Sequence, residues 1–440
     1  MKKDKQLEIA KWSMQKALDQ GADQVAVTVL NQRNIEIEFR DKKLEKLKES
    51  TQNSLSLKIY LSNKYSSHST NDFRKETLDK LISEAVAGTK FLTPDEYRSL
   101  PDAKYYPQGK PDNFNLHDSA YEKIDAESRV DLARAIEASA MAQSDQIISS
   151  TSGYNDSEYS GVRLHSNGLE GDVQGTVFST GAEVTVSDPN GGRPEDYYYA
   201  RSRFFNALPD PEKLGKWAAQ RALKKIGQDK IASGQYDMLV ENRTCSRLIG
   251  MLISPMSGRA LQQKSSFLEG KLGEKIASEK FTLIDDPLFP KGLGSRWYDG
   301  DGIAAKKRIM IDKGILGNYY IDDYYGRKLG MEPTTGSTSN LIVQPGRSSL
   351  DDLTKQITKG ILITGFIGGN SNSTTGDFSF GIMGFLIENG TITKPVNEMN
   401  ISGNAKTFWT QLAGVGNDPY PYSAWRTPSL LFEKVEFSGI

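Results

Sequence analysis

The amino-acid sequence predicts an α+β fold with two main domains. Apolar residues recur at helical spacing in some segments and alternate with a period of two in others, so helices and half-buried strands are both expected. The second half is rich in glycine and hairpin turns, which favours a β-rich domain there. A chain of 440 residues also exceeds one comfortable hydrophobic core. We therefore expect an N-terminal mixed α/β domain, over 1–227, followed by a β-rich C-terminal domain.

The first part of the N-terminal domain, 1–92, begins with a predicted helix over 4–20, which Gly21 ends. Alternating stretches follow, and this pattern predicts antiparallel strands with one buried face. Their apolar positions are Val25, Val27 and Val29; Ile35, Ile37 and Phe39; and Leu55, Leu57, Ile59 and Leu61. A second helix comes next, with Leu78 and Ile82 on its apolar side.

Residues 93–118 are predicted to connect the two parts of this domain. Their polar sequence contains four prolines, which interrupt any regular hydrogen-bond ladder. These are Pro94, Pro101, Pro107 and Pro111. The second part, 119–227, carries a predicted helix over 126–142, strands between Ile147 and Phe205, and a short helix from Pro211.

The C-terminal domain, 228–440, is larger than either part of the N-terminal domain, and we place the boundary at Gly227–Lys230. One helix is predicted near its start, about Thr244–Ser257, with its last turn bent or ended at Ser254-Pro255. Two hairpins are predicted further along, and an Asn-Gly pair favours a type I′ turn in the second. Their turns are Lys313-Gly314, between Ile309–Ile311 and Tyr319–Ile321, and Asn389-Gly390.

The charge balance argues against nucleic-acid binding as the main function. Lysine and arginine (55) nearly equal aspartate and glutamate (56), which gives a formal net charge of −1. A nucleic-acid binder usually carries a basic surplus that neutralises phosphates, so we expect no direct nucleic-acid partner. The charged N-terminus leads into no apolar core, and no run approaches the ~20 apolar residues that span a bilayer. We therefore expect no membrane association and a cytoplasmic location.

Metal ligands are scarce. A zinc peptidase of the His-Glu type needs two histidines one helical turn apart, with a carboxylate that activates water. The three histidines, His68, His117 and His165, are far apart in sequence and all lie in the N-terminal domain. The single cysteine, Cys245, is interpreted as a small buried hydrophobe. No metal ligand is therefore predicted in this chain.

Acidic and glycine-rich clusters have ordinary interpretations as turns. The acidic pairs could bind Ca²⁺ or Mg²⁺, but turns also require Asp beside Gly or Pro, and no EF-hand spacing occurs. They are Asp285-Asp286, Asp299 with Asp301, and Asp322-Asp323. The glycines of 365–376 are followed by a predicted strand, Phe378–Phe380, whereas a phosphate-binding loop requires a helix. No Gly-x-Ser-x-Gly motif indicates a nucleophile.

Short motifs in the second half carry a resemblance to a known family. They are, in chain order, Lys264–Leu268, Leu272-Gly273, Asp285–Pro287, Gly292–Ser295, Asp301-Gly302, Arg327–Met331, Thr375–Ser379, Gly381, Gly384-Phe385, Glu388–Gly390, Pro395-Val396, Ile401–Asn404 and Val415–Asp418. Less specific matches in the first half are Gly21–Asp23, Ser69–Asp72 and Leu100–Asp102. On these motifs the chain resembles the TldD/PmbA family over nearly its whole length. It is most similar to the TldE (PmbA) branch, whose older label is "modulator of DNA gyrase".

The resemblance implies a subunit of a zinc metallopeptidase complex that acts in proteolysis or peptide maturation. TldD-like chains of the family carry a His-Glu-x-x-x-His helix, which TldE-like chains have lost. The comparable helix here, about Thr244–Ser257, contains no His and no Glu, so no catalytic residue is carried over. The implied cofactor is zinc in a TldD-like partner, with which this chain forms a heterodimer. The implied substrate is a peptide or an unfolded protein, and a homodimer of the isolated chain is a further option.

Two other functions stay open at this point. One is a non-enzymatic interaction protein of the gyrase-modulator kind, which acts without a peptidase partner. The other is a self-sufficient enzyme with an unfamiliar site. A neighbouring gene for a zinc-bearing relative would favour the peptidase subunit over both.

Motif position and glycine content suggest eight residues for peptide or partner binding. Extended peptides often add a strand to a sheet edge, and glycine lets another backbone approach closely. Ordinary turns are the alternative for both glycine-flanked segments, Lys291–Gly302 and Gly365–Gly376. The candidates are Gly292, Gly294, Asp299, Asp301, Gly302, Arg327, Gly376 and Asp377. The tyrosines at 197–199 match no motif, and both an interface and buried packing are open for them.

Overall fold

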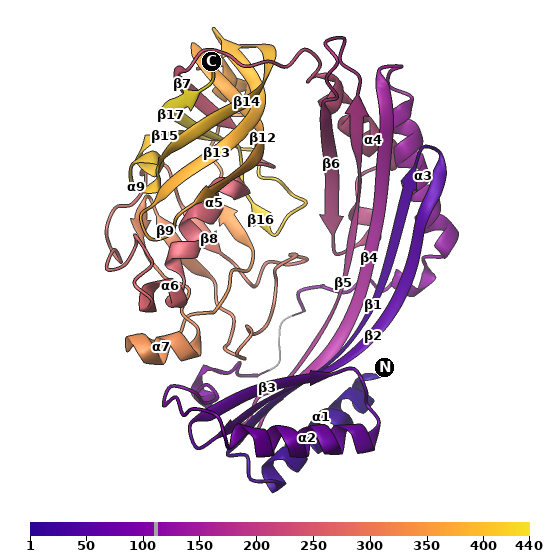
Figure 1. The fold of residues 1–440 in the computed structure, drawn as a ribbon, viewed down its shortest axis with the longest axis vertical. Helices are drawn as coiled ribbons and strands as arrows, with labels where there is room; N and C mark the ends of the chain where they lie inside the picture. The colour runs from indigo at the N-terminus through magenta and orange to yellow at the C-terminus, as the bar shows by residue number, and fades with distance from the viewer. Residues whose placement is uncertain (110–112) are drawn as a thin grey trace.

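The computed structural model describes residues 1–109 and 113–440, and it confirms the α+β fold (Figure 1). The first half forms one large sheet with helices on it, and the second half forms a β-rich domain beside that sheet. Pro111 of the predicted connection lies outside the described residues. Among the described residues, no helix is both long and apolar enough to cross a lipid bilayer.

The large sheet has six strands in the order β3-β2-β1-β4-β5-β6, and every neighbouring pair is antiparallel. Its strands are β1 Gln24–Arg40, β2 Lys43–Leu61, β3 Lys64–Thr70, β4 Ile147–His165, β5 Glu170–Val186 and β6 Glu195–Ser202. Strand β1 pairs with β4 from Ala26–His165 to Arg40–Thr151. The two parts of the N-terminal half, on either side of the 93–118 connection, therefore share a single sheet.

Four helices cover one face of this sheet, two at each end (Figure 1). They are α1 Lys3–Asp19, α2 Lys75–Thr89, α3 Ala126–Met141 and α4 Pro211–Leu223. Helix α1 ends before Gly21, whose φ of 100° is readily adopted only by glycine. Asp125 and Asp210 cap α3 and α4 by accepting backbone N–H groups, and Pro211 occupies the first turn of α4. All four helices were predicted from apolar periodicity.

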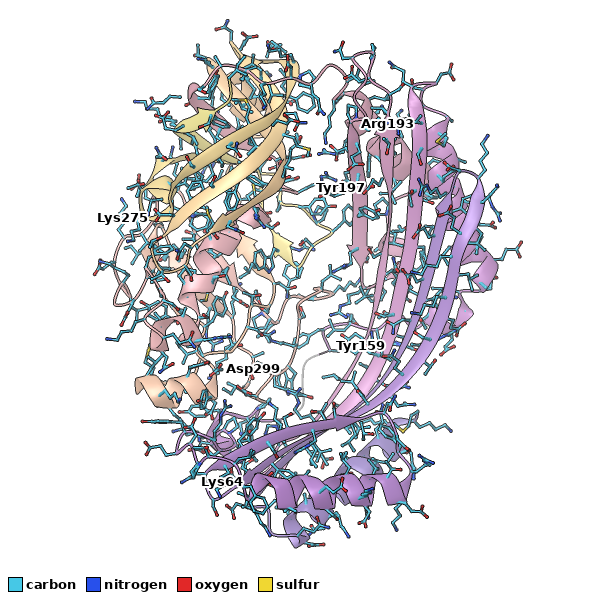
Figure 2. The ribbon with its side chains drawn as sticks, viewed as in Figure 1. Lys64, Tyr159, Arg193, Tyr197, Lys275 and Asp299 are labelled. Atoms are coloured by element: carbon cyan, nitrogen blue, oxygen red, sulfur yellow. The ribbon has the colours of Figure 1, made fainter. Side chains whose placement is uncertain are left out.

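The opposite face of the sheet is polar and turns toward the C-terminal domain. Figure 2 shows Tyr159 of β4 and Tyr197 of β6 on this side. Successive side chains of a strand point to opposite faces, so the three consecutive tyrosines do not all face the same way. Tyr198 packs on Trp217 of α4, with 5.0 Å between ring centres. Tyr197 and Tyr199 point the other way and are 52% and 38% exposed. Packing against a helix therefore describes Tyr198, whereas Tyr197 and Tyr199 are exposed, as an interface requires.

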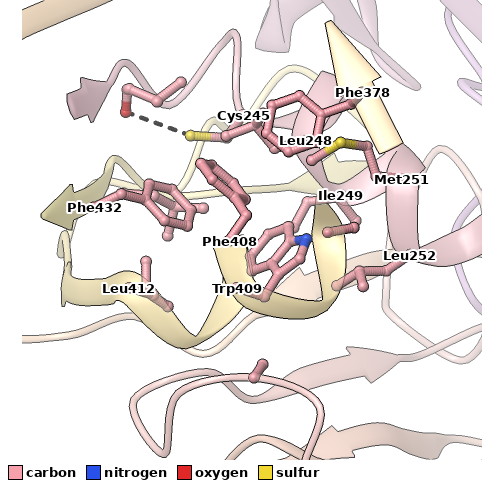
Figure 3. Packing of buried hydrophobic residues seen from close by; sticks show 14 of the residues in the cluster. Cys245, Leu248, Ile249, Met251, Leu252, Phe378, Phe408, Trp409, Leu412 and Phe432 are labelled. Atoms are coloured by element: carbon pink, nitrogen blue, oxygen red, sulfur yellow. Dashed lines mark hydrogen bonds between the residues drawn. The ribbon is translucent and has the colours of Figure 1, made fainter. Parts of the chain in front are cut away.

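The C-terminal domain contains a closed barrel of five strands. Its order is β14-β13-β12-β7-β17, and the pairing of Ile401 in β14 with Phe437 in β17 closes it. The strands are β7 Gly234–Val240, β12 Lys359–Ser371, β13 Asp377–Glu388, β14 Thr391–Asn404 and β17 Leu430–Ser438, with β15 Leu412–Val415 added beside β17. Helix α5, Ser246–Ile253, packs into an aromatic core with Phe408, Trp409 and Phe432 (Figure 3). The rings of Phe408 and Phe432 stack with 4.3 Å between their centres.

A second sheet of the domain has the order β10-β9-β8-β11-β16 and much shorter strands. They are β8 Leu283–Asp285, β9 Arg308–Asp312, β10 Ile315–Leu316, β11 Leu341–Val343 and β16 Trp425–Arg426. Four short helices complete the domain: α6 Gly258–Gln262, α7 Asp323–Leu329, α8 Leu350–Lys355 and α9 Ala405–Phe408.

The two predicted hairpin turns are present, with one correction. Asn389 and Gly390 have φ values of 50° and 76°, as a type I′ turn requires, and they join β13 to β14. Lys313-Gly314 likewise joins β9 to β10. The prediction that Tyr319–Ile321 is the second strand of that hairpin is wrong. A two-residue turn leads directly into its partner strand, Ile315–Leu316, and Tyr320 N–H instead donates to the Met256 carbonyl at 2.9 Å.

The helix predicted over about 244–257 is α5 followed by a 3₁₀ turn, Ser254–Met256. Pro255 has no N–H to continue the α-helical ladder, so the predicted break at Ser254-Pro255 is confirmed.

Candidate functional site

Helix α5 presents no metal ligand. Its inward side carries Leu248, Ile249 and Leu252, and its exposed residues include Arg247. Cys245 at its start is fully buried and donates its S–H to the Val240 carbonyl at 3.4 Å (Figure 3). Burial raises the pKa of the thiol well above its usual value. A thiol held protonated in an apolar core is a poor zinc ligand.

Each of the three histidines contacts a different side chain. His68 Nε2 contacts Ser66 Oγ at 3.0 Å, and His117 Nε2 lies 2.7 Å from Glu158 Oε1. His165 Nδ1 lies 2.9 Å from the Tyr106 hydroxyl, and burial lowers the pKa of this imidazole to about 3. Within residues 1–109 and 113–440, no three His, Cys, Asp or Glu side chains gather to hold a metal ion. The described residues therefore do not fit a zinc site of the kind that the TldD-like chains carry.

Asp299 lies in a contact between the sheet and the C-terminal domain and is 3% exposed. Its Oδ1 accepts the backbone N–H groups of Asp301, at 2.9 Å, and Ile303, at 3.0 Å, and its Oδ2 accepts that of Gly336 at 3.2 Å. Arg163 of β4 donates to the Asp299 carbonyl at 2.9 Å. Burial, and the nearby charge of Asp301, raise the pKa of Asp299. This carboxylate organises a loop against the sheet.

Gly302 packs where a side chain does not fit. Its φ is 84°, and a Cβ would lie 2.5 Å from Leu169 Cδ2 and 3.0 Å from His165 Cε1. Asp301 beside it lies 3.8 Å from the Lys58 ammonium of β2. We call this contact the interdomain joint; it comprises Lys58, Arg163, His165 and Leu169 on the N-terminal side and residues 298–303 on the other.

Gly292 and Gly294 pack against the chain itself. A Cβ on Gly292 would lie 2.7 Å from Asn340 Oδ1, and one on Gly294 would lie 2.6 Å from the Ser339 carbonyl. The Gly294 N–H donates to Asn340 Oδ1 at 2.9 Å. The Gly292 carbonyl accepts from Arg203, which follows β6, at 3.2 Å. The close backbone approach expected of these glycines is present, and the approaching groups belong to this chain.

Arg327, on α7, reaches back to the connection between the two parts of the N-terminal half. Its Nη2 donates to the Leu100 carbonyl at 2.7 Å and pairs with Asp323 at 2.9 Å. Burial raises the pKa of Asp323 to about 6, against the opposing effect of Arg327. Arg327 thus has intramolecular partners near the joint.

Gly376 and Asp377 lie elsewhere, at the turn between β12 and β13. Gly376 has a φ of 89°, and its carbonyl accepts from Ala405 at 2.7 Å. Asp377 Oδ1 accepts from Asn404 Nδ2 at 2.8 Å. Because all these partners belong to the C-terminal domain, the structure does not bring Gly376 and Asp377 together with the joint.

A second space between the sheet and the C-terminal domain is open. It consists of two adjoining hollows of about 420 and 490 Å³, which share Arg201, Leu293, Tyr422 and Ser423. Each volume is in the range of known ligand sites. We call this space the arginine–tyrosine cleft; its principal side chains are Tyr197, Tyr199, Arg201, Lys291, Tyr422 and Arg426.

No ion pair forms at Arg201, Lys291 or Arg426 within residues 1–109 and 113–440. Arg243, which also lines the cleft, pairs with Asp196 and Glu241. Among the described residues, no Asp or Glu lines either hollow, and the exposed side chains of Arg201 and Lys291 make no hydrogen bond or ion pair. The Lys291 ammonium lies 4.9 Å from the centre of the Phe204 ring. The Arg426 guanidinium lies 4.5 Å from the centre of the Phe289 ring, and burial lowers its pKa. The cleft is therefore positively charged and aromatic.

The free edge of β6 borders this cleft but is partly capped. Arg243 Nη1 donates to the Tyr197 carbonyl at 2.9 Å, and the Tyr420 hydroxyl donates to the Tyr199 carbonyl. These carbonyls are the groups that an added strand would use. The carbonyls of Tyr197 and Tyr199 are therefore already occupied by side chains of this chain.

Comparison with known proteins places the chain in a family. Residues 25–88, 120–226 and 233–439 match domain 1, the central domain and the C-terminal domain of the PmbA/TldA metallopeptidases. These matches occur in family order and span most of the chain. The chain belongs to the PmbA/TldD metallopeptidase family. Helix α5, which lacks His and Glu, lies within the part that matches the family's C-terminal domain.

Individual relatives place the chain on the PmbA/TldE side of the PmbA/TldD family. Metalloprotease PmbA from Escherichia coli O157:H7 is 27% identical over 422 residues, which cover 95% of this chain and 93% of that protein. The crystal structure of a protein described as a modulator of DNA gyrase from Bacteroides thetaiotaomicron is 41% identical, with a TM-score of 0.97 and 100% coverage of both chains. TldE from Thermococcus kodakarensis shares the fold, with a TM-score of 0.87, 21% identity and coverage of 98% of this chain and all of that one.

Sequence reasoning missed the arginine–tyrosine cleft. Its cations come from three distant segments, at Arg201, Lys291 and Arg426, and no short motif links them. The available signal was the tyrosine run at 197–199 in a predicted strand, because alternate residues there must face opposite sides.

Proposed function

We propose that this chain is the zinc-free, TldE-like subunit of a two-chain zinc peptidase. Its partner is a TldD-like chain that holds the zinc and cleaves a peptide or an unfolded-protein substrate. The observation that carries the proposal is the composition of α5 in a metallopeptidase-family domain. A zinc peptidase needs three protein ligands and a base for the bound water. Helix α5 offers leucine, isoleucine, methionine and an arginine instead.

Two features support a role in holding a partner or a substrate. The edge of β2 from Lys43 to Ser54 pairs with β1 only, whereas Leu55–Leu61 also pair with β3. An extended segment of another chain can add a strand at such an edge. The arginine–tyrosine cleft adds a charged recognition surface between the domains. The fully buried thiol of Cys245 is compatible with a reducing compartment, and we place the complex in the cytoplasm.

The proposal is tested by purifying the tagged chain from its native host and measuring bound zinc and peptide cleavage. We expect a second chain bearing His-Glu-x-x-x-His to co-purify, with cleavage that a chelator abolishes. The matched control is the same tagged chain expressed alone in a foreign host, which should contain no stoichiometric zinc and cleave nothing. Stoichiometric zinc and cleavage in that control would overturn the proposal.

The alternative function is a non-enzymatic interaction protein. It is favoured by one finding, that solved structures of similar chains from Bacteroides thetaiotaomicron and Thermotoga maritima are described as modulators of DNA gyrase. Co-purification of gyrase from the native host, without a zinc-bearing chain and without cleavage, would support this alternative against the peptidase subunit. A homodimer of the isolated chain is compatible with either function.

A further inference from the structure

We propose that the arginine–tyrosine cleft recognises carboxylate side chains of an acidic, extended peptide. The inference rests on the proposed function in one respect, because it treats that peptide as the substrate of the complex. It adds a substrate class and a binding site.

The first step is the imbalance of charge in the cleft. Arg201 and Lys291 are exposed, lie on opposite domains, and have no ionic partner among the described residues. In contrast, the interdomain joint contains paired or hydrogen-bonded charged groups, such as Asp301 with Lys58 and Arg163 with the Asp299 carbonyl. Cations that converge on one space without carboxylates repel one another, and a bound anion relieves this repulsion.

The second step is a buried guanidinium that keeps its charge. Arg203 is 4% exposed and donates to the carbonyls of Gly292, Leu293 and Thr176 and to the Tyr159 hydroxyl. All four partners are neutral. Its positive charge therefore stays uncompensated at the base of the cleft and adds to the attraction for an anion.

The third step is a buried ionic cluster behind the cleft. It joins Arg221, Lys225 and Arg243 to only two carboxylates, Asp196 and Glu241. The cluster therefore has one surplus positive charge. The Arg243 side chain lines the cleft and is 8% exposed, and its Nε has no hydrogen-bond acceptor among the described residues, since Glu241 Oε1 is 3.8 Å away.

The shape of the cleft favours a peptide over a compact ion. Tyr197 and Tyr199 stand side by side with 5.7 Å between ring centres, and Tyr422 and Tyr420 face them from the C-terminal domain at a similar mutual spacing, 5.7 Å. Tyrosines offer hydroxyl donors and flat apolar faces for side chains of a flexible ligand. Glu183, which pairs with Tyr197 across β5 and β6, ends the positive region along the sheet. This sets the acidic residues of the peptide between the tyrosines and Arg426.

The test uses the full chain and fluorescence anisotropy with two labelled peptides, one rich in glutamate and one with glutamine at the same positions. We expect the glutamate peptide to bind at least about tenfold more tightly, with an affinity that falls as salt rises. The variant R201E/K291E should lose at least about tenfold in affinity for the glutamate peptide only. Its folding should be unchanged, because both side chains are exposed and neither makes a hydrogen bond or ion pair with the part of the chain that the structure describes.

The matched control is R193E/K216E, which reverses two exposed cations outside the cleft and changes the net charge by the same amount; Arg193, labelled in Figure 2, lies just before β6. This variant should bind both peptides like the wild type. Equal affinity of the wild type for the two peptides, or equal losses in both variants, would overturn the proposal. Tighter binding of a single-stranded oligonucleotide than of the glutamate peptide would also overturn it.

A final arm separates a substrate from a segment of the partner. In the reconstituted complex, R201E/K291E should raise the KM for acidic peptides at least about fivefold and leave subunit association unchanged. Weakened association with unchanged KM would make the cleft a subunit contact and overturn the proposal. Failure of peptide binding with an intact zinc-dependent complex would leave the proposed subunit role standing.

Discussion

The two places where the sheet meets the C-terminal domain differ in how their polar groups are satisfied. In the interdomain joint, Asp299 accepts three backbone N–H groups, and Asp301 lies opposite Lys58. In the arginine–tyrosine cleft, Arg201 and Lys291 have no such partners among the described residues. The joint is therefore a completed intramolecular interface, whereas the cleft is, in our proposal, completed by an acidic peptide. Glycine content had suggested residues of the joint for peptide or partner binding, and unpaired charge points to the cleft.

The largest expected effect is a difference in the free energy of unfolding between two variants, Arg203→Ala and Arg201→Ala. Arg203→Ala removes hydrogen bonds from four acceptors, two in buried and two in partly buried hydrogen bonds, and should lower the free energy of unfolding by about 3 kcal/mol. Arg201→Ala should change it by less than about 0.5 kcal/mol, since its side chain is exposed and unpaired. Chemical denaturation of both variants measures the difference. Equal destabilisation would show that the cleft arginine also holds the fold together.

A smaller effect tests the close packing of the joint. Gly302→Ala should lower the free energy of unfolding by about 2 kcal/mol, because φ is 84° and the new Cβ meets Leu169. Gly300→Ala is the matched control, since its Cβ would meet nothing within 4 Å and its φ is not left-handed. Thermal unfolding of both variants gives the comparison. A Gly302→Ala protein as stable as the control would contradict the packing described for the joint.

The smallest effect is a pH dependence near the joint. The pKa of Asp323 is about 6 in the folded chain, above the ordinary 3.8, so the unfolded chain ionises first as the pH rises. The wild type should therefore lose stability relative to Asp323→Asn between about pH 4 and pH 6, by on the order of 1 kcal/mol after allowing for solvent exposure. Denaturant titrations from pH 4 to pH 7 measure this difference. A difference that is flat, or that grows in favour of the wild type, would show that the Arg327 ion pair dominates.

Long periodic elements could be predicted from the sequence. Apolar spacing predicts β1, the second half of β2 and the helices α1 to α4, and Asn389-Gly390 predicts the β13–β14 hairpin. The strands between Ile147 and Phe205 were predicted from their composition. The strands β8, β10, β11 and β16 have two or three residues each, which is too short for a period to be visible. The pairing of β1 with β4 could not be predicted either, because more than a hundred residues separate them along the chain.

The residues of the candidate site could likewise be predicted only in part. Five of the eight predicted residues have contacts with the N-terminal half: Gly292, Asp299, Asp301, Gly302 and Arg327. Gly294 packs against Ser339 and Asn340 of its own domain. Gly376 and Asp377 pack within the barrel domain. The cleft depends on charges brought together from distant segments, so only the fold reveals it.

Hydrogen–deuterium exchange of the full chain, with and without the glutamate-rich peptide, tests the contrast between joint and cleft most directly. The account predicts slower exchange over residues 197–201, 291–293 and 420–426 when the peptide is bound. We expect no change over residues 299–303, where the N–H groups of Asp299, Asp301, Gly302 and Ile303 already have partners within the chain. Protection confined to the joint, with none along the cleft, would contradict the account.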